Sequence, residues 1–292
     1  MRISFQGEIE SLLAGIHILA KELAFEVGAG ELAVTVQRRE GELVVEKDHN
    51  SATICFEKEI HFFRGLGLLL EGIAKGETNF SIRELPQFKT NGAMFDCSRN
   101  AVMRLETVKS ILRKMAIMGL DTLMLYTEDT YEIPNRPYFG YLRGRYTYEE
   151  LSQLDQYAAK LGIEIVPCIQ TLGHLAQALK WEVMAEYRDN EDILLADTEQ
   201  TYEFIEEMIR AATKPFRSKR IHIGMDEAHQ LGLGRYLDLY GYQRRFEIML
   251  RHLERVLAIT KKYDLEPMIW SDMFFRLGSK TGDYYDLDSQ IP

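Results

Sequence analysis

Apolar positions repeat with helical and strand spacing over residues 1–88. The stripe Leu12, Leu13, Ile16, Leu19 and Leu23 predicts a helix over residues 9–25. Short apolar runs predict strands at 32–36, 43–45 and 52–56, followed by a helix at 61–73. The polar stretch 84–90 indicates a junction. We therefore expect a small N-terminal α/β domain over residues 1–88.

From residue 91 onward, strand and helix patterns alternate. Strands are expected at 92–96, 121–126, 163–168, 220–224 and 267–270, and helices at 105–118, 148–161, 198–213 and 243–263. The strand segments are nearly continuous apolar runs, which is typical of parallel strands covered on both faces. Repeated strand–helix units of this length predict a parallel sheet or a barrel.

Composition narrows the function classes. The chain of 292 residues is 46% hydrophobic and 27% charged, as in ordinary soluble proteins. Its formal charge of −10 argues against nucleic acid and anionic membrane surfaces as partners. The N-terminal segment carries glutamates where a signal peptide would need an apolar run, and no apolar stretch of about 18 residues occurs. We therefore expect a cytoplasmic protein.

The cysteines give no sign of a disulfide framework or a metal site. Cys55, Cys97 and Cys168 are odd in number, lack CxxC spacing and lie among apolar residues. This pattern is typical of reduced core residues. No cofactor is expected, and association into a homo-oligomer stays open.

The most informative segment is Arg220–Glu227, RIHIGMDE. A short apolar strand delivers two adjacent carboxylates, Asp226 and Glu227, and then passes into a Gly-containing loop. For an isolated Asp-Glu pair a solvated turn is the usual explanation. In α/β folds, however, the carboxyl end of a strand is where ligands bind. The preceding strand therefore favours a functional site.

The other predicted strands also end in polar or aromatic side chains. The strand ends read Asp96-Cys97-Ser98-Arg99, Tyr126-Thr127-Glu128-Asp129, Gln170-Thr171-Leu172-Gly173-His174, Asp226-Glu227 and Trp270-Ser271-Asp272. A (β/α) barrel builds its site at this face, from the ends of several strands. Five such ends are hard to explain by packing alone.

The spacing of these motifs resembles a known family. GAMFDCSRN, LMLYTEDTYEI, PCIQTLGH, HIGMDEAH and PMIWSDMF together resemble glycoside hydrolase family 20, the β-N-acetylhexosaminidases. Met225 stands where a second Gly is usual. The resemblance implies a small α/β domain at 1–88 and a catalytic (β/α)8 TIM-type barrel domain at 89–292. It also implies an amino-sugar glycoside or oligosaccharide as substrate.

The resemblance implies an exo-acting hydrolase that releases terminal β-linked GlcNAc or GalNAc by substrate-assisted, retaining catalysis. Glu227 is then the general acid and later the base, and Asp226 holds the acetamido N–H of the sugar. Charge repulsion fits this division, because two nearby carboxylates disfavour double ionisation.

The resemblance also implies substrate-binding residues. Arg99 would hold the sugar hydroxyls, His174 and Asp129 (preferred over Glu128) would support the acid, Trp270 would form an aromatic wall, and Asp272 would bind a hydroxyl. For Arg99 the alternative is an ion pair with Asp96. His222 is expected to be a hydrogen-bonded core residue, and Trp181 is assigned no role.

The predicted barrel lacks its last strands. Five strands are used by Asp272, and the residues up to Pro292 are too few for three more strand–helix units, so we expect a truncated barrel. One alternative function is a catalytically impaired or truncated carbohydrate-binding homologue. Another is a metal-dependent hydrolase using His174, His222, Asp226 and His229. No HxxxH or HxH signature supports a metal site.

Overall fold

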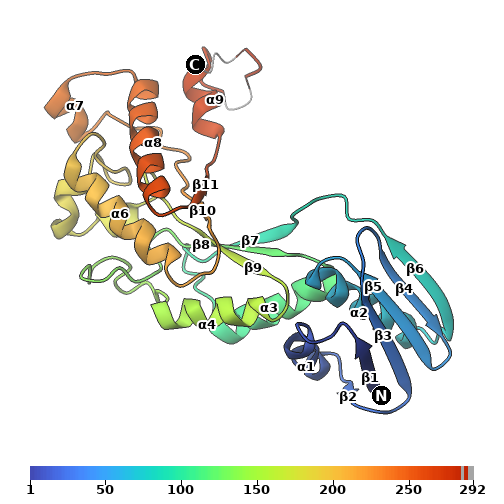
Figure 1. Cartoon of the computed structure of the whole chain (residues 1–292). Helices are drawn as coiled ribbons and strands as arrows, with labels where there is room; N and C mark the ends of the chain where they lie inside the picture. Colours follow the sequence, from blue (N-terminus) through green and yellow to red (C-terminus); the bar gives the residue numbers. More distant parts are fainter. Residues whose placement is uncertain (284–285, 289–292) are drawn as a thin grey trace. The chain divides into compact units, whose positions relative to one another are not determined.

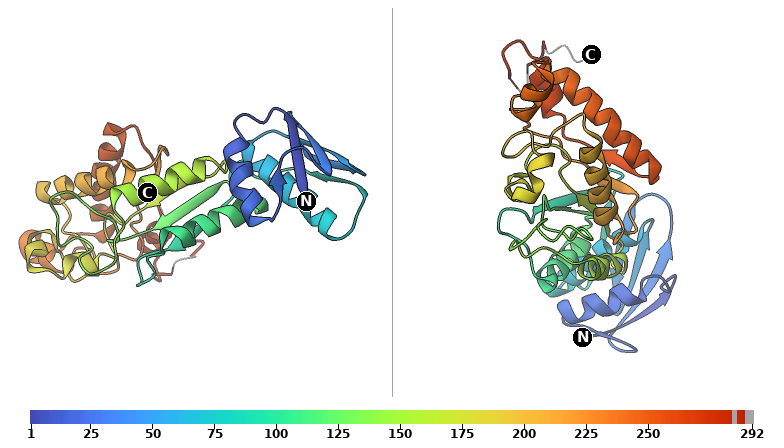
Figure 2. Two further views of the ribbon diagram at one scale, coloured as in Figure 1. Left: turned by 90° about the horizontal axis from the view of Figure 1, so that it is seen from below. Right: turned by 90° about the vertical axis from the view of Figure 1, so that its left-hand side faces the viewer.

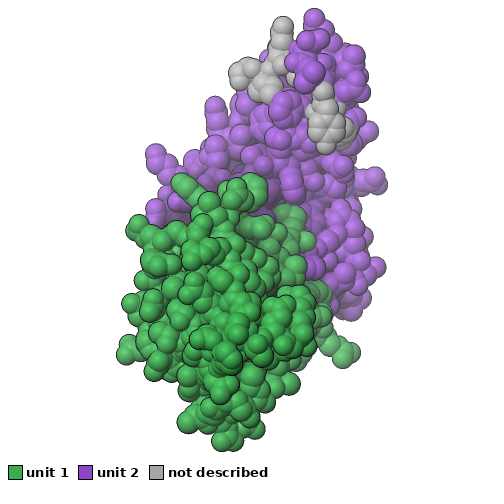
Figure 3. Space-filling view, turned by 90° about the vertical axis from the view of Figure 1, so that its right-hand side faces the viewer, with its two compact units in different colours: residues 1–94, 103–123, 153–165 green, residues 95–102, 124–152, 166–292 purple. Residues whose placement is uncertain are grey.

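A computed structural model describes residues 1–283 and 286–288. It divides into two compact units, coloured separately in Figure 3. The first unit comprises residues 1–94, 103–123 and 153–165, and the second comprises 95–102, 124–152 and 166–292. The domain boundary expected at residue 88 stays a prediction.

The first unit contains a six-stranded sheet in the order β2-β1-β3-β5-β4-β6 (Figure 1). Its strands are β1 Arg2–Gly7, β2 Glu26–Val27, β3 Leu32–Arg38, β4 Leu43–Asp48, β5 Ser51–Phe56 and β6 Asn79–Glu84. Strand β4 is antiparallel to β5 and β6, whereas β1, β3 and β5 pair in parallel. The helices over residues 1–88 are α1 Leu13–Glu22 and α2 Glu59–Ala74. The three strands and two helices expected in this region are all present.

Helix α2 supplies the core of the first unit. Its Phe62 and Phe63 are fully buried, and the Phe62 ring packs edge-on against Phe56, with 5.7 Å between ring centroids. Strands β1, β2 and β6 were not predicted. Strand β6, NFSIRE, alternates apolar and polar residues, a pattern typical of a half-buried strand, so its signal was available in the sequence.

The second sheet has five strands in the order β11-β10-β9-β8-β7, which is their order along the chain. They are β7 Gly92–Asp96, β8 Thr122–Tyr126, β9 Glu164–Cys168, β10 Arg220–His222 and β11 Glu266–Met268. Strands β9, β10 and β11 pair in parallel. All five predicted strands are present. Strands β7 and β11 end the sheet order, so the described residues form an α/β sheet but no closed barrel.

Long helices connect these strands as predicted. They are α3 Leu105–Met118, α4 Tyr148–Ala159, α6 Glu199–Thr213 and α8 Arg245–Lys262. Thr198 caps α6 by accepting a hydrogen bond from the Thr201 N–H. Helices α6 and α8 pack against each other in the second unit (Figure 2).

Shorter helices were not predicted. They are α5 Ala176–Leu179, the 3₁₀-helix η1 Glu182–Tyr187, α7 Arg235–Tyr240 and α9 Asp272–Gly278. Helix α9 corrects one expectation. The strand expected at 267–270 ends at Met268, where its pairing with β10 stops, so Trp270 lies beyond the strand and Asp272 begins α9.

A further expectation concerns the burial of the cysteines. The three cysteines are buried thiols, as predicted. Among the described residues, no helix is both long and apolar enough to cross a bilayer.

Candidate active site

The segment after β10 turns sharply where it delivers the acid pair. Gly224, Met225 and Glu227 have φ angles of 73°, 72° and 50°, in the left-handed region. Such conformations are uncommon for residues other than Gly and gather at functional sites. The Met225 side chain is fully buried, whereas the Glu227 side chain is 55% exposed. The turn therefore anchors the segment in the core and leaves Glu227 open to a ligand.

Gln170, which follows β9, fixes the second acid. Its Nε2 donates to Asp226 Oδ1 at 2.6 Å and to the Tyr126 hydroxyl at 2.8 Å. Its Oε1 accepts the Met225 N–H at 3.0 Å. Gln170 is fully buried, and these bonds satisfy its amide group. Without them, burial of the amide would cost stability. The side chain of Asp226 is thereby oriented by the neighbouring strand.

His174 lies between the two acids. Its Nε2 is 3.2 Å from Asp226 Oδ2 and 3.4 Å from Glu227 Oε2, without a well-aligned hydrogen bond to either. The nearby Asp226 raises the pKa of His174. Burial by itself would raise the pKa of Asp226, but His174 and Gln170 outweigh it and hold that pKa below its ordinary value. Asp226 is therefore ionised at neutral pH.

Arg99 and Glu128 form the other side of the site. The Tyr126 hydroxyl donates to Glu128 Oε1 at 3.0 Å, and Arg99 Nη2 lies 3.5 Å from the same oxygen. Arg99 Nη1 is 2.6 Å from Asp96 Oδ2, so the ion pair considered as an alternative role is present. The Arg99 side chain is nevertheless 59% exposed and can still meet a ligand.

The structure separates Asp129 from His174, together with which it was expected to support the acid. The Asp129 side chain is buried, its Oδ1 lies 3.3 Å from Arg143 Nε, and it makes no hydrogen bond or ion pair with His174. Glu128 instead lies near enough to His174 for its charge to help raise the pKa of His174. Burial raises the pKa of Glu128. The neighbour that was not preferred therefore joins the site.

Residues around β11 complete the cluster. The backbone N–H of Trp270 donates to the Gly224 carbonyl at 3.2 Å. The centroid of the Trp270 ring lies 4.6 Å from that of the His222 ring. His222 is buried and its Nδ1 accepts the Gly224 N–H, which confirms the expected hydrogen-bonded core role. Asp272 Oδ2 accepts the Glu227 N–H at 3.1 Å. Asp272 thus positions the backbone of Glu227, and its contact with a hydroxyl stays a prediction.

The contacts link the ends of all five strands, and β11 joins through Asp272, which accepts the Glu227 N–H. One chain of polar contacts runs from Arg99 through Glu128, Tyr126, Gln170 and Asp226 to His174. Sequence reasoning placed Tyr126 and Gln170 at strand ends but gave them no role, and it considered Glu128 only as the alternative to Asp129. Their position was the available signal, whereas their pairing depends on neighbouring strands.

The hypothesis of a metal-dependent hydrolase requires a group of metal ligands. Within residues 1–283 and 286–288, no three His, Cys, Asp or Glu side chains are grouped to hold a metal ion. Through Nδ1, His222 already accepts the Gly224 N–H.

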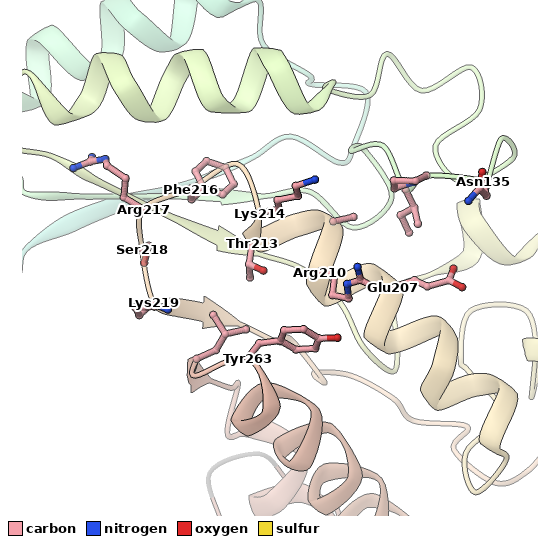
Figure 4. A pocket seen from close by; sticks show the side chains of 14 residues that line it. Asn135, Glu207, Arg210, Thr213, Lys214, Phe216, Arg217, Ser218, Lys219 and Tyr263 are labelled. Atoms are coloured by element: carbon pink, nitrogen blue, oxygen red, sulfur yellow. The ribbon is translucent and has the colours of Figure 1, made fainter.

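A cavity of about 580 Å³ lies elsewhere in the second unit (Figure 4). It is lined by Ile133, Pro134, Asn135, Glu207, Arg210, Ala211, Thr213, Lys214, Phe216, Arg217, Ser218, Lys219, Tyr263 and Leu265. Its one carboxylate, Glu207, binds Arg136 in a bidentate pair. Because it lacks paired acids, we place the candidate active site at the strand ends.

The fold and the site define an α/β protein of barrel-type strand order with a carboxylate cluster at the carboxyl end of its sheet. A family model described as "Glycosyl hydrolase family 20, catalytic domain" matches residues 88–284. The chain belongs to glycosyl hydrolase family 20.

Individual relatives are distant. The chain is 26% identical over 230 residues to a beta-hexosaminidase from Vibrio furnissii, covering 64% of this chain and 38% of that protein. It is 26% identical over 170 residues to hexosaminidase D from Bos taurus, covering 53% and 48%. The chain thus spans less than half the length of either relative.

Solved structures share the fold. The beta-N-acetylhexosaminidase from Streptomyces coelicolor A3(2) superposes with a TM-score of 0.76 at 20% identity, covering 94% of this chain and 62% of that one. A mutant beta-hexosaminidase from Streptomyces plicatus, in complex with GlcNAc, gives 0.75 at 20% identity, covering 93% and 61%.

Replacing Gly224 should disturb the site. A Cβ at Gly224 would lie 2.1 Å from Gln170 Oε1 and 2.7 Å from the Ile169 carbonyl oxygen. We expect Gly224→Ala to lower the free energy of unfolding by about 1–3 kcal/mol more than Gly241→Ala, because of overpacking. Gly241 is the matched control, since its φ of 74° equals that of Gly224 within 1° and its Cβ would meet nothing within 4 Å. Equal losses in urea unfolding would contradict the clash.

The raised pKa of His174 predicts a pH dependence of stability. Its charged contact with Asp226 contributes fully below the unfolded pKa of about 6.5 and is lost as pH rises through the higher folded value. The difference in unfolding free energy between wild type and His174→Gln should therefore shrink between about pH 6 and pH 9. The same substitution at the exposed His17 is the control. A difference that stays constant across this range would refute the coupling.

Proposed function

We propose that the chain carries the catalytic site of an exo-acting glycoside hydrolase that releases terminal β-linked N-acetylhexosamine. The observation that carries the proposal is the placement of Asp226 and Glu227 on either side of His174, within one polar network at the strand ends. The family match supports the same reaction class. The similar Streptomyces plicatus enzyme was solved with GlcNAc, which supports an amino sugar as ligand.

The proposed reaction is substrate-assisted and has two steps. In the first, the acetamido oxygen of the sugar attacks the anomeric carbon while the bond to the leaving oxygen breaks. Glu227 gives its proton to that oxygen, and an oxazolinium ring forms. In the second, Glu227 takes a proton from water, whose oxygen attacks the anomeric carbon and reopens the ring. The configuration is retained because the carbon is attacked twice.

Asp226 suits the charge-stabilising role. The oxazolinium carries positive charge, and a carboxylate held ionised beside it lowers the energy of that state. Gln170 fixes its orientation, so little reorganisation is needed during the reaction. Glu227 is the more exposed acid and can reach both the leaving group and water.

The remaining residues would hold the sugar. Arg99 presents several fixed donors to vicinal hydroxyls. Trp270 is 38% exposed and offers a ring face to the apolar side of a pyranose. His174 would tune Glu227 and Asp226 together. Glu128 supports this side of the site through Tyr126 and Arg99.

Removing the proposed acid tests the enzyme. Glu227→Gln should lower kcat on an aryl β-N-acetylglucosaminide by about 10²–10⁴-fold, because proton transfer to the leaving group is lost. Glu254→Gln, at an exposed position in α8, is the control and should retain wild-type activity. Identical background rates in wild type and Glu227→Gln would remove the enzyme hypothesis. Binding of GlcNAc oligosaccharides without turnover would then favour the carbohydrate-binding alternative.

Comparing two substrates tests the participation of the acetamido group. Hydrolysis of the N-acetylated glycoside should exceed that of the free amine by at least about 100-fold, since only the former supplies an intramolecular nucleophile. Equal rates would contradict substrate assistance while leaving a hydrolase in place.

A further inference from the structure

Three aromatic side chains form a cluster that the proposed chemistry does not use. Tyr138 and Tyr141 lie in the connection after β8, and Trp181 lies in the connection after β9. The ring centroids are 5.9 Å apart for Tyr138–Tyr141 and 5.5 Å apart for each tyrosine with Trp181. We call these three residues the aromatic platform. The two connections are thus held together by ring contacts.

The two tyrosines of the platform are open to solvent, whereas Trp181 is half-buried. Tyr138 and Tyr141 are each 45% exposed, and the neighbouring Leu142 and Val183 are 83% and 56% exposed. Lys180 Nζ lies 5.0 Å above the Trp181 ring and 2.9 Å from Gln177 Oε1. Ring faces beside hydrogen-bonding side chains match the surface of a sugar, which has an apolar C–H face and a rim of hydroxyls.

Two observations tie the platform to the candidate active site. A Cβ at Gly140, between the two tyrosines, would lie 2.3 Å from the Asp129 carbonyl oxygen, so this loop rests directly on the residue after Glu128. Lys180 is also close enough to Asp129 to lower its pKa, although burial of Asp129 is the larger effect and raises it. The connections that carry the platform therefore also carry Glu128 and His174.

We propose that the aromatic platform binds the sugars that follow the scissile bond in a β-linked oligosaccharide of N-acetylhexosamine. This inference rests on the proposed function. Continuity with the site favours a glycan over a separate protein partner, because the two connections that carry the platform also carry Glu128 and His174. The first sugar is held at the strand ends, and later sugars stack on Tyr138 and Tyr141. The platform thereby selects oligosaccharides over small glycosides.

The two tryptophans allow a direct binding test. Trp181 and Trp270 are the only tryptophans in the sequence, so Trp270→Phe leaves Trp181 as the sole indole fluorophore. In a Trp270→Phe, Glu227→Gln double variant, we expect β-linked GlcNAc tetrasaccharide to change Trp181 emission with saturation, and GlcNAc itself to leave it unchanged. No change with the tetrasaccharide would overturn the proposal. This variant leaves the platform intact, so the test does not depend on how platform substitutions fold.

Kinetics give a second test. Tyr141→Ala should lower kcat/KM for the tetrasaccharide by about tenfold, the effect expected from losing one stacked ring, and leave an aryl β-N-acetylglucosaminide unaffected. Tyr240→Ala is the matched control, since Tyr240 is 46% exposed and lies outside the platform. An equal loss on both substrates, or a changed oligomeric state of Tyr141→Ala in size-exclusion chromatography, would overturn the platform.

The two proposals fail separately. Turnover of the aryl glycoside without any response of Trp181 to the tetrasaccharide overturns the platform and leaves the proposed function. A saturable change in Trp181 emission on addition of the tetrasaccharide, without turnover of any glycoside, overturns the proposed hydrolase function. That result supports the platform as a glycan-binding site.

Discussion

The order of five strands along one sheet is the constraint on which the candidate site depends. Each strand lies beside its neighbour in sequence, and the long helices between them return the chain to the same starting edge. Every strand therefore releases its next residues at the same edge of the sheet. Five short segments that are far apart in sequence can then meet in one network without any long loop. The polar side chains therefore gather at this edge of the sheet.

Burial and pairing shift the pKa values of the carboxylates of this network in different directions. Asp226 stays charged because His174 and Gln170 outweigh its burial, whereas burial raises the pKa of Glu128. The difference arises from partners rather than from residue type, since both are carboxylic acids in the same cluster. The network thereby holds its negative charge at Asp226, next to His174.

The sequence predicted elements with a strong local signal and missed those without one. Strands β7 to β11 and the four long helices have continuous apolar runs or a clear helical stripe, so their existence could be predicted. The short helices α5, α7 and α9 depend on packing against the rest of the chain, which no local pattern reveals. In the site, Asp226, Glu227 and His174 followed from motif spacing. The choice between Glu128 and Asp129 did not, because it depends on contacts with other segments: Glu128 contacts Tyr126 and Arg99, whereas Asp129 is buried against Arg143.

Gly224 has a consequence for comparing this chain with others. A side chain there would meet Gln170 and also the main-chain oxygen of Ile169, so shortening residue 170 could not make room for it. The two carboxylates, by contrast, are compatible with many backbone conformations, including ones in which their side chains point in other directions. A distant homologue that retains both acids but has a bulkier residue at this position must hold them differently. The absent side chain is therefore a stricter marker of a shared site than the acids themselves.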